Sequence, residues 1–258
     1  MTTQTPPGLL AHWTREDARH HAARTIVVLP VGAFEQHGPH LPLATDAILV
    51  EEVAKRAAAL VPGAVVGPTF TVGSSDHHLP YGGTASLSTG TLVHVLTDAV
   101  ESLLLSGFAS VFLLNGHGGN VEIIKLVARD VGIRRGAFAG SGSYFQLAAE
   151  QLEAAGAGDI GLVPGHAGAF ETSMMLAVHP ELVRQSSVPH RERPAAGWVG
   201  PKAYHFASPE PFRAPDGFSD SPDAGSAERG AEFLSICVNA TREALADFAG
   251  AVITQIDV

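Results

Sequence analysis

Two short polar segments carry side chains that suit a divalent metal ion, the first with carboxylates and an imidazole and the second with an imidazole between glycines. In the first, Glu35 and His37 stand two residues apart, and Asp46 follows after a short loop. Side chains two residues apart in an extended chain point to the same side, so Glu35 and His37 can converge on one ion. Asp46 adds a carboxylate whose two oxygens can bridge two ions. A merely polar turn is the alternative interpretation, although the flanking Gly and Pro residues stiffen this loop.

The second segment is the glycine-rich loop at residues 115–120, with the sequence NGHGGN. Core packing explains His117 poorly, because glycines on both sides let the backbone and a ligand approach closely. A phosphate-binding loop is the alternative, but the Lys-Ser/Thr ending of a P-loop and the G-x-G-x-x-G spacing are missing. We therefore favour metal or substrate binding here, and the backbone N–H groups of Gly118 and Gly119 are candidate substrate contacts.

Two later segments carry further titratable side chains. His166 lies in a Gly-rich loop and is a candidate general acid or base, with an exposed loop histidine as the alternative. Glu171 comes directly before a predicted apolar helix at residues 172–178, where a carboxylate could simply favour the helix start. The paired histidines at 77 and 78 could bind a metal ion, but we expect His78 and Tyr81 to line a substrate entrance.

Strands and helices are predicted to alternate along most of the chain, with several of these polar segments directly after strands. Strands are expected at residues 25–31, 64–72, 109–114 and 137–141, and helices at residues 46–60, 91–105, 121–131, 144–155 and 227–248. This alternation predicts an α/β fold with a mostly parallel sheet and helices on both faces. Ligands of such sheets bind beyond the carboxyl ends of the strands, where the polar segments lie. Residues 187–226 have little periodicity, which indicates a functional, flexible or assembly segment.

Composition narrows the functional classes. The 258 residues suit one domain spanning 1–258, and 45% hydrophobic residues allow a sizeable core. The net charge of −10 argues against nucleic acid as a partner. No apolar run reaches the length of about 18 residues typical of a membrane span, and no secretory signal is evident, so we expect a cytoplasmic protein. A single cysteine, Cys237, excludes an internal disulfide and a cysteine-built zinc site.

Together the motifs resemble the creatininase family of amidohydrolases, which includes formamide deformylases and mycofactocin-type peptidases. The matching motifs are VGAFEQHGPHLPLATD (31–46), HLPYGGTASLS (78–88), LLNGHGGN (113–120), HAGAFETSMMLAVHPELV (166–183) and GSAERG (225–230). The resemblance implies a three-layer α/β/α sandwich, usually a homohexamer, with two divalent ions that are zinc, manganese or iron. It further implies that Glu35, His37, Asp46 and His117 bind the metal ions, that Asp46 bridges them, and that His166 is catalytic.

The chain departs from creatininase proper at two points. There, the histidine of the third motif is followed two residues later by a metal-binding glutamate, whereas this chain has Gly119. Glu171 is the natural remaining carboxylate, as in relatives that share the NGHGGN form. Creatininase also encloses its flat ring substrate with tryptophans, and the matching positions here are Phe145 and Leu162. These differences argue against creatinine as the substrate.

The resemblance implies hydrolysis of a C–N amide or cyclic amide bond of a small molecule by a metal-activated water, with His166 donating a proton to the departing nitrogen. One alternative is a metallopeptidase that releases C-terminal residues from a small peptide. Another is a metal-binding relative of the same fold without catalytic activity. A nucleotide-binding α/β protein is disfavoured by the missing phosphate motifs.

Overall fold

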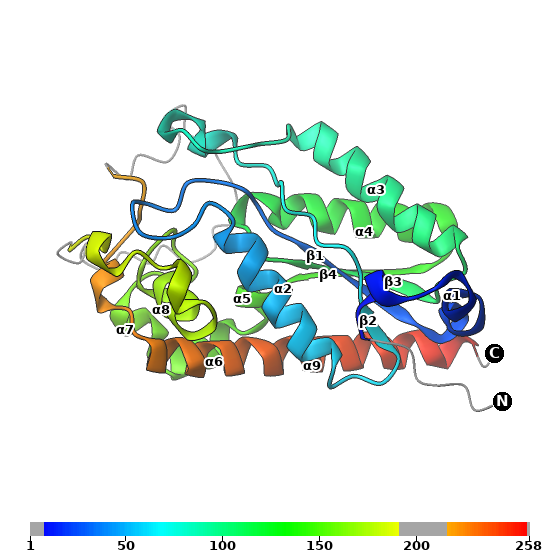
Figure 1. Cartoon of the computed structure of the whole chain (residues 1–258). Helices are drawn as coiled ribbons and strands as arrows, with labels where there is room; N and C mark the ends of the chain where they lie inside the picture. Colours follow the sequence, from blue (N-terminus) through cyan, green and yellow to red (C-terminus); the bar gives the residue numbers. More distant parts are fainter. Residues whose placement is uncertain (1–7, 191–215, 257–258) are drawn as a thin grey trace.

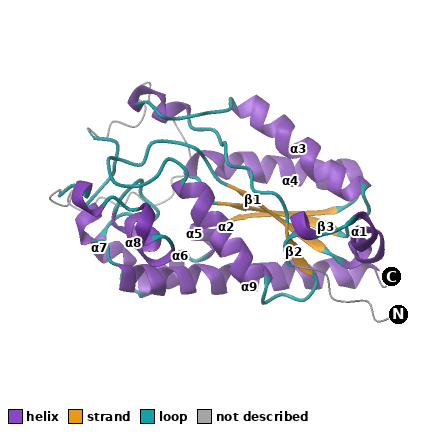
Figure 2. Cartoon of the chain, viewed as in Figure 1, coloured by secondary structure: helices purple, strands orange, loops and turns teal. Residues whose placement is uncertain are grey.

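A four-stranded parallel sheet forms the centre of the molecule in the computed structural model, which describes residues 8–190 and 216–256 (Figures 1 and 2). The strands are β1 (Ile26–Val31), β2 (Ala64–Val66), β3 (Ser110–Asn115) and β4 (Phe138–Ser143), in the spatial order β2-β1-β3-β4. Every pairing is parallel, as predicted. The order reverses between β1 and β3, and this is where open α/β sheets bind ligands, beyond the carboxyl ends of the two strands.

Helices cover both faces of the sheet and give the three-layer α/β/α arrangement. Helices α3 (Thr89–Leu105) and α4 (Val121–Arg135) pack on one face, and α2 (Thr45–Ala58) and α9 (Ala227–Ile256) on the other (Figure 1). Successive side chains of a strand point to opposite faces, so β1 supplies Val28 to the α2/α9 core and Leu29 to the α3/α4 core. Burial on both faces explains why β1 and β3 are almost continuously apolar.

The smaller helices lie around this sandwich. They are α1 (Arg15–His21), α5 (Tyr144–Leu147), α6 (Ala149–Ala154), α7 (Ala157–Ile160) and α8 (Ala169–Val178). Helix α8 packs against α9 at very short range, because a Cβ atom on Gly230 would lie only 1.8 Å from the carbonyl oxygen of Ser173. This glycine therefore sets the separation of the two helices.

Several element boundaries differ from those predicted. Strand β2 ends at Val66 instead of residue 72, because Pro68 has no N–H for the ladder, although the chain stays beside β1. The predicted helix at residues 144–155 is interrupted at Ala148 and forms α5 and α6. Helix α9 runs to Ile256, beyond the predicted end at residue 248. Among the described residues, no helix is long and apolar enough to cross a membrane.

The first turn of α2 has no side-chain cap. Thr45 and Asp46 are residue types that favour the N-cap position, but the N-cap is Ala44, and it makes no side-chain capping bond. The hydroxyl of Thr45 donates instead to the carbonyl oxygen of Pro42. Asp46 consequently lies inside the first turn, where its carboxylate is free to face the end of the sheet.

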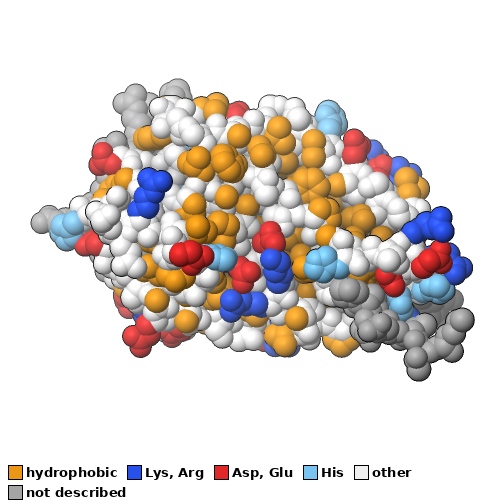
Figure 3. Space-filling model, viewed as in Figure 1, with side chains coloured by type: hydrophobic (Ala, Val, Ile, Leu, Met, Phe, Trp, Pro, Cys, Tyr) orange, Lys and Arg blue, Asp and Glu red, His pale blue; other side chains and the backbone are white. Residues whose placement is uncertain are grey.

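The surface is mixed in charge on the face seen in Figure 3, where Lys and Arg side chains are scattered among acidic and apolar ones. This pattern fits the net charge of −10 for the whole chain. That face therefore offers no continuous basic surface.

Candidate metal and active site

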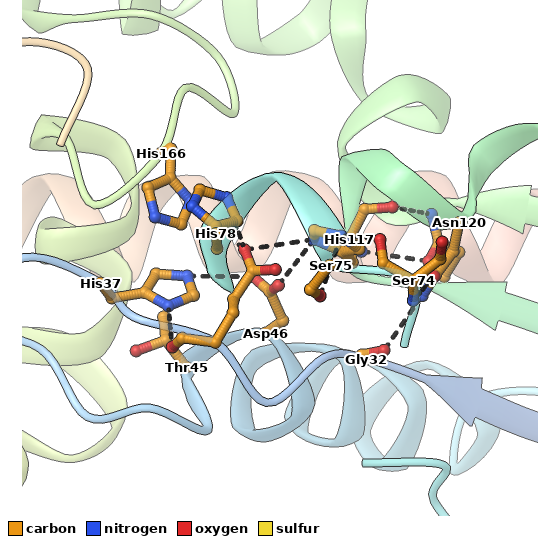
Figure 4. Close-up of polar contacts among 12 residues, drawn as sticks. Gly32, His37, Thr45, Asp46, Ser74, Ser75, His78, His117, Asn120 and His166 are labelled. Atoms are coloured by element: carbon orange, nitrogen blue, oxygen red, sulfur yellow. Dashed lines mark hydrogen bonds and ion pairs between the residues drawn. The ribbon is translucent and has the colours of Figure 1, made fainter. Parts of the chain in front are cut away.

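Most of the residues that we singled out meet at the carboxyl ends of β1 and β3, at a cavity of about 200 Å³. Glu35 and His37 come from the loop after β1, Asp46 from α2 and His117 from the loop after β3 (Figure 4). The cavity is lined by Glu35, Asp46, His77, His78, Gly116, His117, Gly118, Gly119, Pro164, Gly165, His166 and Glu171. Segments far apart in sequence thus form one site at the point where the strand order reverses.

Asp46 stands between two groups of potential metal ligands. Its Oδ1 lies 3.3 Å from Nε2 of His37, and its Oδ2 lies 3.0 Å from Nδ1 of His117. Glu35 completes the group around His117, at 3.4 Å, and Glu171 completes the group around His37, at 3.7 Å. The ligand atoms within each group lie within 4.8 Å of one another. This arrangement can hold two cations that share the Asp46 carboxylate.

Three carboxylate oxygens of this site lack a hydrogen-bond partner. Both oxygens of Glu35 and Oδ2 of Asp46 are buried without a hydrogen bond. Burial raises the pKa of Glu35 to about 7 and that of Glu171 to about 8. Leaving a buried carboxylate unpaired is unfavourable, and a cation would supply the missing partner. The residues present therefore fit a pair of divalent ions.

Backbone contacts orient the two imidazoles toward these carboxylates. The Nε2–H of His117 donates to the carbonyl oxygen of Ser74 at 3.1 Å, so its Nδ1 faces the acids. His117 is itself held by Asn115, which accepts a bond from its N–H at 3.0 Å and donates to its carbonyl at 2.7 Å. The Nδ1–H of His37 donates to the carbonyl of Glu35 at 3.1 Å, so its Nε2 faces Asp46. Such outer contacts fix the tautomer of a metal-binding histidine.

The site also raises the pKa of His37 when no metal is bound. Complete burial opposes the charged imidazolium, but the carboxylates of Asp46, Glu171 and Glu35 outweigh burial and raise the pKa to about 10. In turn, although burial opposes ionisation of Asp46, His37 and His117 hold the pKa of this carboxyl below its usual range. A cation would replace the protons on these imidazoles.

His166 lies beside the ligand groups and is buried, so the alternative of an exposed loop histidine is wrong. Its Nε2 lies 2.7 Å from the carbonyl oxygen of Gln36, which can only accept, so the ring proton sits on Nε2. Its Nδ1 faces Oε1 of Glu35 at 3.4 Å. Burial, with His37 and His78 nearby, lowers the pKa of His166 and favours the neutral ring. The lone pair on Nδ1 is therefore available to accept a proton in the cavity.

Three of the four predicted substrate contacts line the cavity. His78, Gly118 and Gly119 line the cavity, whereas Tyr81 does not and lies with its ring centroid 6.4 Å from that of His78. Neither position matched to the creatininase tryptophans lines the cavity. Phe145 is buried against Tyr144, and Leu162 is 44% exposed. The described residues therefore form no aromatic enclosure around this cavity.

Two contributors were not among the predicted site residues. His77 lines the cavity, with its ring stacked on that of His117 at 5.8 Å. Gln36 is buried, and its side-chain Nε2 donates to Nδ1 of His78 at 3.0 Å while its Oε1 accepts from the backbone N–H of Gly38. The sequence indicated Gln36 only through its position between Glu35 and His37, because polar neighbours of metal-binding residues often hydrogen-bond to the residues around the site.

The structure leaves no room for a side chain at position 119, and Glu171 supplies a carboxylate to the cavity from another element. A Cβ atom on Gly119 would lie 2.3 Å from the carbonyl oxygen of Ser74 and 2.6 Å from Nε2 of His117, so no side chain fits there. Glu171 approaches from α8 instead. It was expected at the head of a helix, but α8 begins at Ala169, and Glu171 lies in its first turn, with Oε2 accepting from the N–H of Ala167 at 2.6 Å.

Comparisons with known proteins identify the family of this chain. The family model described as creatininase, creatinine amidohydrolase, matches residues 11–245. The creatinine amidohydrolase of Pseudomonas putida is 31% identical over 251 residues, covering 90% of this chain and 93% of that protein. A mycofactocin precursor peptide peptidase of Mycobacterium ulcerans is 34% identical over 167 residues, covering 61% of this chain and 60% of the peptidase. A solved creatininase with Mn superposes with a TM-score of 0.75 at 27% identity, covering 93% of this chain and 97% of that one. The chain belongs to the creatininase family.

Proposed function

We propose that this protein is an amidohydrolase that uses two divalent metal ions to cleave a C–N amide or cyclic amide bond of a small molecule. Glu35, His37, Asp46, His117 and Glu171 would hold the ions. The observation that carries this proposal is the position of Asp46, whose two carboxylate oxygens face two separate groups of potential ligands. Membership of a hydrolase family supports the same activity.

From the family resemblance we propose zinc or manganese, and iron after them; imidazole and carboxylate ligands suit all three ions. When bound, such a pair of ions polarises the carbonyl group of the substrate and lowers the pKa of water toward 7. The sole cysteine, Cys237, is not one of the cavity-lining residues. Thiolate ligands are therefore no part of the proposal.

His166 would carry the proton through the reaction. Its ring is neutral at rest with Nδ1 toward the cavity, so it first accepts a proton from the attacking water. Water oxygen then forms a bond to the carbonyl carbon, and Nδ1 returns the proton to the nitrogen as the C–N bond breaks. The backbone of Gly118 and Gly119 borders the same cavity and would contact the substrate.

The cavity supports an uncharged reacting group. Within residues 8–190 and 216–256, its lining contains no Lys or Arg, and its volume of about 200 Å³ suits a small amide. A small peptide cleaved near its C-terminus is the second candidate, favoured by the 34% identity to the mycofactocin peptidase. Assaying the metal-loaded protein on lactams, formamides and short peptides distinguishes the two.

Metal content tests the proposal directly. We would purify the protein without chelator and measure Zn, Mn and Fe by plasma mass spectrometry, beside Asp46→Ala and the control Asp98→Ala on the exposed side of α3. About two ions per chain are expected in the wild type and the control, and none in Asp46→Ala. Wild-type protein that takes up none of the three metals when they are supplied would refute the proposal.

His166→Ala provides a second test, because it should retain the metal ions and lose turnover. Full turnover of this variant on the true substrate would exclude the proton-transfer role. We further propose, from the family resemblance, that the chain forms a homohexamer. Light scattering coupled to gel filtration would measure its mass.

A further inference from the structure

A buried carboxylate outside the cavity organises the loop that carries His166. Asp220 is only 1% exposed. Its Oδ1 accepts a hydrogen bond from the N–H of Ala169 at 2.8 Å. Its Oδ2 accepts from the N–H of Leu162 at 3.1 Å and from the hydroxyl of Ser219 at 2.9 Å. All three partners are donors, so the site requires acceptors on both oxygens of the side chain.

This carboxylate replaces a local cap on α8. The N-cap residue, Gly168, has no side chain to bond the first turn, and Asp220 supplies that acceptor from a distant segment. The loop wraps closely around it, because a Cβ atom on Gly161, Gly165 or Gly168 would lie 2.6, 2.9 or 2.3 Å from an Asp220 oxygen. The negative charge also suits the positive end of the helix.

Ser219 extends the contact to His166. The Ser219 hydroxyl accepts from the N–H of His166 at 2.9 Å while it donates to Asp220, and the Ser219 N–H donates to the carbonyl of His166 at 2.8 Å. Both backbone polar groups of His166 are therefore held by one residue. The same segment packs on Gln36, since a Cβ atom on Gly217 would lie 2.2 Å from Oε1 of Gln36.

We propose that Asp220, acting through Ser219, is a positioning residue that holds the His166 ring against the carbonyl of Gln36 and so directs Nδ1 into the cavity. Asp220 does not line the cavity and touches no reacting atom. The importance of this placement for turnover rests on the proposed function of His166. The placement itself can be measured without a substrate.

The test uses the ring N–H of His166 as a probe. Protein labelled with 15N-histidine is studied by NMR with zinc and without it, and the His166 signal is assigned by its loss in His166→Gln. Asp220→Asn replaces one acceptor oxygen by a donor. Ser219→Ala removes the hydroxyl that links Asp220 to the His166 N–H, but leaves the backbone bond from residue 219 to the His166 carbonyl and both backbone bonds of Asp220. Asp223→Asn is the control, because it lies in the same segment but pairs with His190 on the surface.

In the wild type and the control we expect a ring N–H that exchanges slowly with water, because it is bonded to Gln36 at 2.7 Å. Exchange should accelerate at least about tenfold in Asp220→Asn and Ser219→Ala, the ratio expected from losing roughly one hydrogen bond. Zinc content should stay the same in all four proteins. A fall in melting temperature without any change in the His166 signal would assign Asp220 a purely structural role and overturn the proposal.

An unchanged His166 signal in Ser219→Ala alone would likewise overturn the proposed path through Ser219. Failure of the proposed function has a different signature, namely wild-type protein that binds no zinc. The NMR comparison without zinc still decides whether Asp220 places His166. The two proposals can therefore fail independently.

Discussion

The contact of α8 with α9 at Gly230 predicts a large effect of a single methyl group. In Gly230→Ala the new Cβ atom would lie 1.8 Å from the Ser173 oxygen and 2.3 Å from its carbonyl carbon. Both are backbone atoms, so no rotamer change relieves the overlap. Reaching an ordinary contact of 3.4 Å requires the helices to separate by about 1.6 Å. That movement also loosens the pair Phe170 and Phe233, whose rings now lie 5.4 Å apart.

We expect Gly230→Ala to lower the free energy of unfolding by about 3 kcal/mol, the upper end of the usual range for overpacking. The same substitution at Gly250, also in α9, is the matched control, since a Cβ atom there meets nothing within 4 Å. Gly250→Ala should raise stability by about 0.5–1 kcal/mol through helix propensity. Urea unfolding followed by circular dichroism measures both. A Gly230→Ala protein within about 0.5 kcal/mol of the wild type would refute the reasoning.

Three further outcomes are expected. Gly119→Ala should lose bound metal, because its Cβ atom would lie 2.3 Å from the carbonyl oxygen of Ser74. Gly118→Ala is the control and should retain the metal, because a Cβ atom there meets nothing within 4 Å; plasma mass spectrometry measures the metal content of both variants. Metal binding should release protons, and the affinity for the metal should rise from pH 6 to 9. The reason is that the pKa of His37 is raised to about 10 in the metal-free site, so its proton must leave before the metal binds. Unbuffered titration with an indicator dye detects the released protons. Burial raises the pKa of Cys237 to about 12, so a thiol reagent at pH 8 should react with this residue only after unfolding, and rapid reaction of the native protein would contradict its burial.

The sequence predicts the sheet and much of the site for a physical reason. Strands β1 and β3 are buried on both faces, so their apolar runs stand out, and the polar residues directly after them must lie at the carboxyl edge. Glu35, His37 and His117 follow from this rule without any knowledge of distant contacts. The parallel direction of the strands was likewise expected, because strands and helices alternate along the chain.

The parts that were missed depend on contacts between distant segments. Asp220 lies in the segment 187–226, which was predicted to be functional, flexible or part of an assembly, but whose sequence singles out no residue. The partners of Asp220 at Leu162 and Ala169 are more than 50 residues away. The start of α8 at Ala169 was missed for the same reason, since its cap comes from Asp220. Residues 191–215 of the irregular segment predicted at 187–226 lie outside the described residues.

The origin of Glu171, the third acidic residue of the proposed metal site, has a consequence for how the site would assemble during folding. Glu35, Asp46 and His117 all lie in the first half of the chain, whereas Glu171 comes from α8, which packs against α9. A relative with its glutamate two residues after the histidine needs no such docking for that ligand. With Glu171 as a ligand, as proposed, binding of an ion by His37 and Glu171 would be linked to the packing of α8 on α9, so metal loading would stabilise these two helices together. Metal content at that position would then report how much of the protein has docked α8 onto α9.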